Sequence, residues 1–441
     1  MEKNKYGLFT TIGMIVGIVI GSGIFFKSDN ILVATNGSIS LGVLIFSIAA
    51  IGIIFGSLSI AELASRTTKS GGVIAYTEDY CNSSTACAFG WFFTILYYPT
   101  LIAVVGWVLG IYLCQLFGIE AGLGVQVSIG FIVLIIDYGL NVLSAKLGGH
   151  LQAAATVIKI IPLIFIAIAG LFLGDTSSFV VSDVTNMQSL GWIAAVAPIA
   201  FAFDGWIVST SISHEIKNPK RNLPLALIIA PIFILIIYIA YFIGISTLVG
   251  PEKVMALGDA HVAYAANQLV GHFGSKIILI FVNISILGTF NGLILGYIRM
   301  PQLLAIRGMI PKSEKFVNVD EKHGISIPSA ILTFIITCIW LLIHYLTQKF
   351  DILPNSDVSE IAVIFSYLVY IVLYIQVIRL KIKGEIKGIW KGIINPTFAI
   401  IGSLVVLVGS LSNSLFIVYA AIFLIIILLG YMYWNKTNKK A

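Results

Sequence analysis

Apolar runs of membrane-spanning length recur along almost the whole of the 441-residue chain. Each approaches the roughly 20 residues that a helix needs to cross about 30 Å of hydrocarbon. The composition agrees with this reading, because 59% of the residues are hydrophobic and only 10% are charged. Soluble globular domains do not combine these proportions. The sequence therefore predicts an all-α integral membrane protein.

Turn signals divide the chain into twelve predicted transmembrane helices. They include TNGS at 35–38, GIEAGLG at 118–124 and KNPKRNLP at 217–224. A polar stretch over 250–275 is long enough for a short extra helix. The twelve spans are expected at 8–34, 38–65, 86–117, 125–143, 149–173, 190–212, 223–248, 276–306, 326–347, 357–380, 393–411 and 414–434.

The distribution of basic residues predicts the orientation in the membrane. With the N-terminus inside, 21 of the 26 lysines and arginines fall on the cytoplasmic side, four fall outside, and Lys159 lies within a span. This asymmetry is a strong positive-inside signal. After MEKNKYG the apolar run continues beyond the length of a signal-peptide core. We therefore expect a multi-pass protein of the plasma (inner) membrane, with both termini cytoplasmic and no nucleic-acid partner.

Two predicted spans carry residues that interrupt a membrane helix. The first contains Gly21-Ser22-Gly23, and a glycine in a helix interior costs roughly 1 kcal/mol relative to alanine. The sixth contains Pro198, followed by FAFDGW at 201–206. The two breaks lie five spans apart. Because five is odd, the second half would enter the membrane from the opposite side, as in an inverted repeat.

Such breaks expose backbone groups at membrane depth, where each unpaired group costs several kcal/mol unless protein, water or ligand satisfies it. Free N–H groups at a helix N-terminus suit an anion, and free C=O groups at a C-terminus suit a cation. An amino acid carries an α-carboxylate and an α-ammonium and would satisfy both sets. A GxG sequence can also serve only close helix packing. The second, symmetry-related break favours a substrate site.

Several motifs around these breaks resemble one protein family. They are GSGIF at 21–25, ELA at 62–64, SGG at 70–72, FAFDGW at 201–206 and EIKNPKRNLP at 215–224. In order and spacing they resemble the amino acid–polyamine–organocation superfamily, and within it the L-type amino acid transporter branch. The chain is most similar to bacterial exchangers of small neutral amino acids, of the serine/threonine or alanine/serine/cysteine type.

The resemblance implies a LeuT-like fold with a 5+5 inverted repeat and broken helices 1 and 6. The first repeat would cover 1–173 and the second 190–380, followed by two helices over 393–434. It also implies sodium-independent antiport of small neutral L-amino acids by alternating access. No cofactor, metal or enzymatic activity is expected.

The same resemblance assigns roles to residues at the breaks. Backbone amides of the first break would bind the substrate carboxylate, and backbone carbonyls at both breaks would bind its ammonium. Phe201 would be the occluding side chain. The expected substrate site comprises Val19, Ile20, Gly21, Ser22, Gly23, Ile24, Phe201, Ala202, Phe203 and Asp204.

Heteromeric relatives carry a cysteine in the outer loop between helices three and four, which links them to a glycoprotein subunit. The corresponding loop here, 118–124, has none. We therefore expect no disulfide-linked heavy subunit. The four cysteines of the chain also lack metal-binding spacing.

Lys159 is a charge at membrane depth, where it costs at least about 2.5 kcal/mol and needs a partner. In sodium-coupled relatives an ion ties helices one, five and eight together. We expect the Lys159 ammonium to replace that ion and to donate to free carbonyls near residues 18–21. Possible neighbours of the site are Ser285, Thr289, Asn291 and Tyr238.

Two alternative functions remain open from the sequence. A proton-coupled amino acid symporter would need a titrating group, and Lys159 could serve if burial changed its protonation. A carrier of cationic amino acids or polyamines would need extra carboxylates in the pocket, where only Asp204 qualifies. Asp137 lies within the fourth span, and Glu62 lies near Arg66, where an ion pair is expected.

Overall fold

We describe the fold from a computed structural model, which describes residues 7–67, 69–143, 158–175, 177, 190–207, 216–320, 323–413 and 415–438. Within these ranges all the regular elements are helices. The all-α prediction is therefore confirmed.

The helices follow one another with short connections. Their bounds are α1 (Leu8–Val19), α2 (Ser22–Phe26), α3 (Ser28–Ala34), α4 (Ile39–Ala64), α5 (Val73–Tyr80), α6 (Ser83–Phe92), α7 (Tyr98–Phe117), α8 (Leu123–Leu143), α10 (Ile160–Leu173), α11 (Val196–Ala202), α12 (Pro219–Val249), α13 (Pro251–Leu257), α14 (His261–Ile306), α15 (Glu314–Val317), α16 (Ile327–Lys349), α17 (Val358–Ile382), α18 (Asn395–Gly409) and α19 (Phe416–Asn438).

Ten helical segments in the described part of the chain are long and apolar enough to cross a membrane. Two shorter apolar helices, Ile160–Leu173 and Gly191–Ala202, fall in the fifth and sixth predicted spans. The residues 149–157 of the fifth span and 208–212 of the sixth span lie outside the described residues. The protein is therefore a multi-pass membrane protein, while the count of twelve and the inverted repeat stay predictions.

The first span is broken where the sequence predicts. Helix α1 ends at Val19, Ile20 is extended (φ −69°, ψ 107°), and α2 begins at Ser22. The chain then passes through Lys27 into α3 and keeps helical backbone hydrogen bonds across the junction. Lys27 N donates to Gly23 O (3.0 Å), and Ile31 N donates to Lys27 O (3.0 Å). The second half of this span is therefore an almost continuous helix.

The sixth span is also broken at its predicted position. Helix α11 follows a 3₁₀ segment, Leu190–Ala195, and ends at Ala202. A turn follows, in which Gly205 has a φ of +98°, a left-handed conformation that favours glycine. The sequence beyond this turn, 208–215, lies outside the described residues and includes the start of the EIKNPKRNLP motif.

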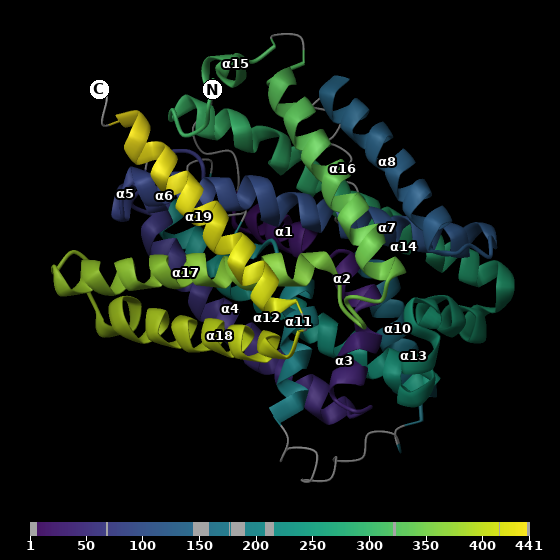
Figure 1. The fold of residues 1–441 in the computed structure, drawn as a ribbon. Coiled ribbons are helices and arrows are strands. Elements are labelled where there is room, and N and C mark those ends of the chain that lie inside the picture. Colours follow the sequence, from purple (N-terminus) through teal and green to yellow (C-terminus); the bar gives the residue numbers. More distant parts are fainter. Residues whose placement is uncertain are drawn as a thin grey trace.

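The broken helices lie within a shell of long helices (Figure 1). Helix α12 packs against α1, α4 and α10, and α14 packs against α7. Helices α17 and α18 run side by side, and α8 lies beside α16. The short helix predicted in the polar stretch after the seventh span is present as α13.

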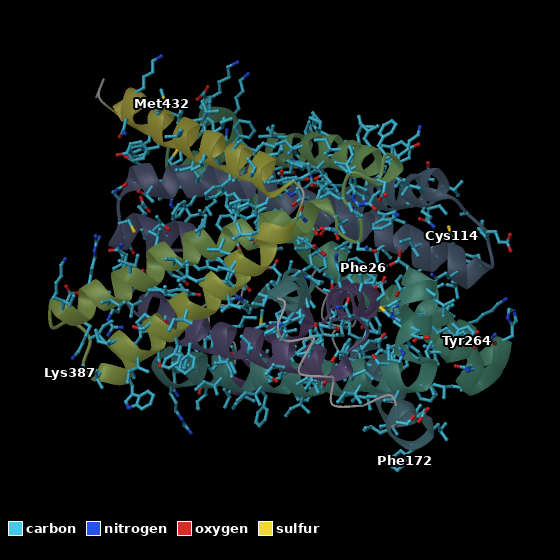
Figure 2. The ribbon with its side chains drawn as sticks, turned by 60° about the horizontal axis from the view of Figure 1, so that its bottom comes forward. Phe26, Cys114, Phe172, Tyr264, Lys387 and Met432 are labelled. Atoms are coloured by element: carbon cyan, nitrogen blue, oxygen red, sulfur yellow. The ribbon has the colours of Figure 1, made fainter. Side chains whose placement is uncertain are left out.

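Figure 2 shows the two ends of the bundle, with Lys387 and Met432 at one end and Cys114 and Tyr264 at the other. Phe26 lies between them, near the middle. The predicted pair of Glu62 and Arg66 is present near the Lys387 end, with Arg66 Nη1 2.7 Å from Glu62 Oε2. The prediction that the two residues pair is confirmed.

Candidate functional site

A cavity of about 170 Å³ lies between the two helix breaks. Five of the ten residues expected in the substrate site line it, namely Val19, Gly21, Gly23, Phe201 and Asp204. The other lining residues are Ile18, Tyr97, Tyr98, Leu101, Val105, Gly205, Thr289, Gly292, Leu293, Leu295 and Gly296. The two breaks therefore open onto one shared space.

Small residues let the broken helices approach each other closely. A Cβ atom added at Gly23 would lie 2.6 Å from the Cα of Ala202, which is closer than packed atoms allow. A Cβ atom at Gly21 would collide with the side chain of Thr289. The two glycines of the first break are thus required by contacts with α11 and with α14, in addition to any ligand.

Tyr238 of α12 connects the two breaks. Its hydroxyl lies 3.1 Å from Val19 O and 2.9 Å from Ala202 O, and the side chain is completely buried. These carbonyls belong to the last turns of α1 and α11, where no intrahelical donor is available. The hydroxyl therefore shares its one proton between two of the carbonyls to which the sequence analysis gives the substrate ammonium.

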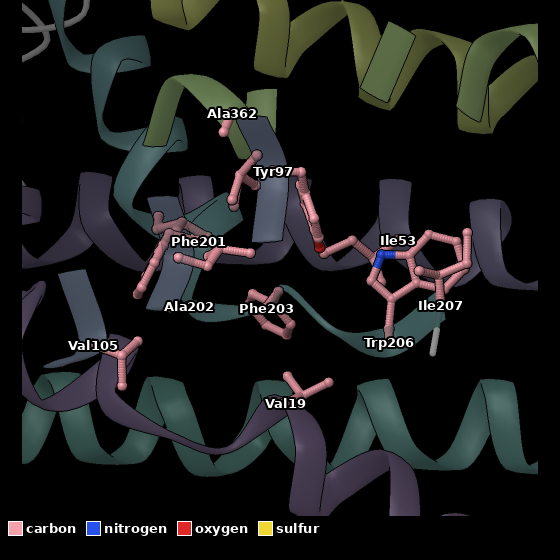
Figure 3. Packing of buried hydrophobic residues seen from close by; sticks show 14 of the residues in the cluster. Val19, Ile53, Tyr97, Val105, Phe201, Ala202, Phe203, Trp206, Ile207 and Ala362 are labelled. Atoms are coloured by element: carbon pink, nitrogen blue, oxygen red, sulfur yellow. The ribbon is translucent and has the colours of Figure 1, made fainter. Parts of the chain in front are cut away.

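The carboxylate of Asp204 is held by a tyrosine from the third span. Tyr97 Oη donates to Asp204 Oδ2 at 2.5 Å (Figure 3 labels Tyr97 near Phe201). Tyr97 ends a π-helical turn, Phe93–Tyr97, just before Pro99, whose missing N–H cannot continue a regular helix ladder. Such π turns are frequent at functional sites.

Lys159 is fully buried and forms hydrogen bonds to two other helices, α1 and α14. Its Nζ donates to Gly17 O in the last turn of α1 (2.7 Å) and to Thr289 Oγ1 of α14 (3.0 Å). The side chain thus ties the first, fifth and eighth predicted spans together. The carbonyl it contacts lies one residue before the expected range of 18–21.

Not every predicted residue faces the cavity. Ile20 and Ile24 are completely buried but absent from its lining, and Phe203 packs on Tyr238 with ring centroids 5.1 Å apart. Ala202 is also absent from the cavity lining, and its carbonyl accepts a hydrogen bond from Tyr238. The side chain of Ser22 lies outside what the structure describes.

The remaining candidate neighbours have other partners. Asn291 accepts a hydrogen bond from Asn141 Nδ2 (2.9 Å), and Ser285 accepts one through its carbonyl from Thr289 Oγ1 (3.5 Å). Asp137 is buried in α8 and does not line the cavity. Of the eighth-span candidates, only Thr289 contacts Lys159 in the described structure.

A larger vestibule of about 380 Å³ adjoins the cavity and shares Tyr97, Tyr98 and Gly296 with it. It extends past Arg299 to Ser70, in the loop after the second predicted span. Toward the opposite end, Phe201 meets Phe26 edge to face with centroids 5.6 Å apart. The cavity therefore continues toward one end of the bundle and meets an aromatic pair at the other.

Two ion pairs lie next to Ser70 at the edge of the vestibule, where Arg307 Nη2 donates to Ser70 O (2.6 Å). Arg307 Nε lies 3.2 Å from Glu78 Oε2, and Lys69 Nζ lies 2.9 Å from Asp79 Oδ1. The hydrogen bond to Asp79 raises the pKa of Lys69 above its usual value, so this ammonium stays charged at neutral pH. Because the Lys69 side chain is 48% exposed, the pair contributes little to stability.

Comparison of the sequence with known proteins identifies the family to which this chain belongs. Residues 6–430 match the family model described as amino acid permease. The chain belongs to this family. It is 28% identical to the serine/threonine exchanger SteT of Bacillus subtilis over 414 residues, which is 93% of this chain and 91% of that protein.

Mammalian transporters are also similar to the chain. The b(0,+)-type amino acid transporter 1 of Mus musculus is 30% identical over 348 residues, 77% of this chain and 70% of the relative. The human cystine/glutamate transporter is 26% identical over 382 residues, 84% and 74% of the respective chains. The predicted superfamily and L-type resemblance are confirmed, and this amino acid permease is a transporter and not an enzyme.

Sequence reasoning missed several parts of the cavity wall. The predicted site did not include Tyr97 or Tyr98 of the third span, nor Gly292 or Gly296 of α14. The sequence YYP at 97–99 holds a signal, because a proline within a long apolar span disturbs the helix just before it. The glycines of α14 give no comparable signal, because glycine, unlike proline, keeps its backbone N–H group and does not mark a break in the predicted helix.

Proposed function

We propose that this permease exchanges small neutral L-amino acids across the plasma membrane by alternating access, with both termini in the cytoplasm. The observation that carries the proposal is the convergence of two helix breaks on one cavity. There, Gly21 and Gly23 at the start of α2 line the same space as Phe201 near the end of α11. The similarity to a bacterial serine/threonine exchanger over 91% of its length supports this substrate class.

In the proposed complex the backbone amides of Gly21, Ser22 and Gly23 bind the substrate carboxylate. The nearly continuous α2 and α3 place the positive end of a helix dipole there. Carbonyls at the ends of α1 and α11 bind the ammonium. Because Tyr238 shares Val19 O and Ala202 O, the substrate would use their second lone pairs or displace the hydroxyl.

We further propose that transport is independent of sodium. The Lys159 ammonium joins α1 to α14 through Gly17 and Thr289, which is the connection that a bound cation would otherwise make. A fixed positive charge at this point also disfavours a second cation nearby. No disulfide-linked subunit is proposed, since the loop at 118–124 has no cysteine.

Asp204 supports a second candidate, a carrier of cationic amino acids. Asp204 lines the cavity, and its carboxylate accepts a hydrogen bond from the hydroxyl of Tyr97. A cationic side chain could pair with this carboxylate, whereas serine or threonine would donate a single hydrogen bond. Competition of arginine or lysine against labelled serine separates the two candidates.

The test is uptake of labelled serine into proteoliposomes that contain the purified protein. Vesicles preloaded with serine should take up label, and empty vesicles should not. Replacing sodium with potassium should leave the rate unchanged. Uptake into empty vesicles driven by a proton gradient would favour a symporter and would overturn the exchange proposal.

A further inference from the structure

Two arginines of the long helix α14 lie near the vestibule, and they differ in their partners. Arg307 Nε lies 3.2 Å from Glu78 Oε2, and its Nη1 donates to Leu303 O (3.2 Å). The exposed Arg299 donates from Nη1 to Leu295 O (2.5 Å) and has no carboxylate partner in the part of the chain that the structure describes. A guanidinium carries five N–H donors. Most of the donors of Arg299 are therefore available to an anion.

Arg299 lies on the face of α14 that also lines the central cavity, which is the cavity between the helix breaks. Gly292 and Gly296 line the central cavity, and Arg299 follows them with the spacing i, i+4, i+7 of one helix face. Its hydrogen bond to Leu295 O directs the guanidinium back along the helix, and Leu295 lines the central cavity as well. One stripe of α14 thus runs from the central cavity to Arg299 in the vestibule.

The vestibule offers this guanidinium no opposing charge. Among the described residues that line it, Arg299 is the one with a charged side chain, and most of the others are apolar or aromatic. Glu78 and Asp79, at the edge of the vestibule, already pair with Arg307 and Lys69. A positive charge beside apolar walls attracts an anion more strongly than the same charge in bulk water. The vestibule is therefore suited to collecting an anionic group.

The way from the vestibule to the central cavity passes Gly296 and two tyrosines. Tyr97, Tyr98 and Gly296 line both cavities. A Cβ atom added at Gly296 would lie 3.5 Å from the ring of Tyr98, in ordinary van der Waals contact. The bare backbone at Gly296 therefore leaves the gap beside Tyr98 wider than a larger residue would.

The two ends of this path are too far apart to hold one substrate carboxylate at the same time. At 1.5 Å per residue, Arg299 lies about 15 Å along α14 from Thr289, the residue that packs against Gly21 of the first break. A small amino acid is much shorter than this distance. A carboxylate at Arg299 and a carboxylate at the amides of the first break would therefore occupy two separate sites.

We propose that Arg299 forms an inner carboxylate subsite, which captures the α-carboxylate of a free amino acid in the vestibule before the molecule enters the central cavity. The planar guanidinium matches a carboxylate with two parallel hydrogen bonds. In the predicted orientation the subsite serves amino acids that arrive from the cytoplasm. The identity of the ligand rests on the proposed function, whereas the binding of a carboxylate at Arg299 does not.

The first experiment measures the protection of a cysteine beside Arg299 in purified protein. Cys81, Cys87, Cys114 and Cys338 are replaced by serine, and Leu303→Cys, one turn beyond Arg299 in the vestibule lining, is labelled with a water-soluble maleimide. The probe is N-acetylserine, which keeps the carboxylate of serine but has no ammonium for the carbonyls of the central site. Serinamide, which has the ammonium and no carboxylate, is the matched ligand control.

N-acetylserine should slow the labelling of the parent by roughly threefold or more, and Arg299→Gln should abolish this protection because a neutral amide cannot form the charge-assisted pair. Arg299→Lys should keep part of the protection, since an ammonium retains the charge but lacks the planar fork. Serinamide should protect none of these proteins. The matched control variant is Lys387→Gln, which removes an exposed lysine outside the vestibule lining and should be protected like the parent.

The second experiment compares serine uptake from the two sides of the membrane, in vesicles preloaded with saturating serine. Everted vesicles present the cytoplasmic side to labelled serine, and right-side-out vesicles present the outer side. At serine concentrations far below saturation, Arg299→Gln should slow uptake into everted vesicles by about tenfold, because capture loses its electrostatic attraction. Uptake into right-side-out vesicles should stay unchanged, and Lys387→Gln should change neither rate.

The proposal is overturned if N-acetylserine does not protect the parent or if it protects Arg299→Gln equally well. It is also overturned if Arg299→Gln slows uptake to the same extent in both kinds of vesicle, because that result places its effect on the central site or on folding. Protection of the parent by N-acetylserine, in a protein that transports no serine, would support the subsite and contradict the proposed function. The two failures are therefore distinguishable.

Discussion

The two helix breaks are built differently, although both open onto one cavity. A buried ammonium supports the first, since Lys159 donates to Gly17 O at the end of α1. Neutral hydroxyls support the second, where Tyr238 donates toward Ala202 O and Tyr97 holds Asp204. Tyr238 reaches both breaks, through its additional contact with Val19 O.

This difference teaches how much each break depends on a single group. A hydrogen bond to a charged group contributes about 1.5–3 kcal/mol, which applies to the bonds of Lys159 and to the bond from Tyr97 to the Asp204 carboxylate. The neutral bond from Tyr238 contributes about 0.5–1.5 kcal/mol. The first break therefore concentrates its support in one side chain, and the second distributes it over several. Substitutions at the first break should accordingly have the larger effects on transport.

The largest effect is expected for Lys159→Ala. The variant removes the charged hydrogen bonds to Gly17 O and Thr289 Oγ1 and leaves a void at membrane depth. Serine exchange in proteoliposomes should fall by about tenfold or more, in line with the loss of roughly 1.5–3 kcal/mol. Membrane expression should remain, and near-normal uptake would show that Lys159 does not support the break.

A smaller but still large effect is expected for Gly23→Ala, which tests the approach of the two breaks. The added methyl group would lie 2.6 Å from the Cα of Ala202, and such overpacking costs about 1–3 kcal/mol. Exchange should decrease and the melting temperature should fall. Gly13→Ala is the control on the same broken helix, because a Cβ there meets no atom within 4 Å. Equal losses in both variants would contradict the contact.

Tyr238→Phe tests a group that contacts both breaks. It leaves Val19 O and Ala202 O without this donor, at a cost of about 1–3 kcal/mol. We expect a several-fold lower exchange rate at an unchanged fold. Tyr241→Phe, one turn along α12, is the matched control, since its buried hydroxyl has no hydrogen-bond partner in the described part of the chain. Both rates should be measured at equal protein content.

The smallest effect is expected for Thr289→Val. It deletes the 3.0 Å acceptor of Lys159 but keeps Gly17 O as the other partner. The side chains have similar shapes, so the cost should be about 1 kcal/mol. Exchange should fall only a few-fold. A loss as large as that of Lys159→Ala would mean that Thr289, and not the carbonyl of α1, is the main partner.

The sequence by itself determined the membrane class, the two breaks and the need of Lys159 for a partner. Hydrocarbon thickness sets the length of apolar runs, and glycine and proline interrupt helices wherever they occur. These constraints are local, so the breaks at Gly21 and at 203–205 lie where they were predicted. A lone lysine in an apolar span needs a partner in any fold.

Tertiary structure alone decided which groups meet across the cavity. Tyr238 lies far along the chain from Val19, and its choice of two carbonyls depends on how α12 crosses both broken helices. The contact of Lys27 with Asp357 joins positions 330 residues apart. Periodicity and composition do not show which distant residues come into contact. A hydrogen bond needs a distance of about 3 Å between its two atoms, and only the packing of the helices sets that distance.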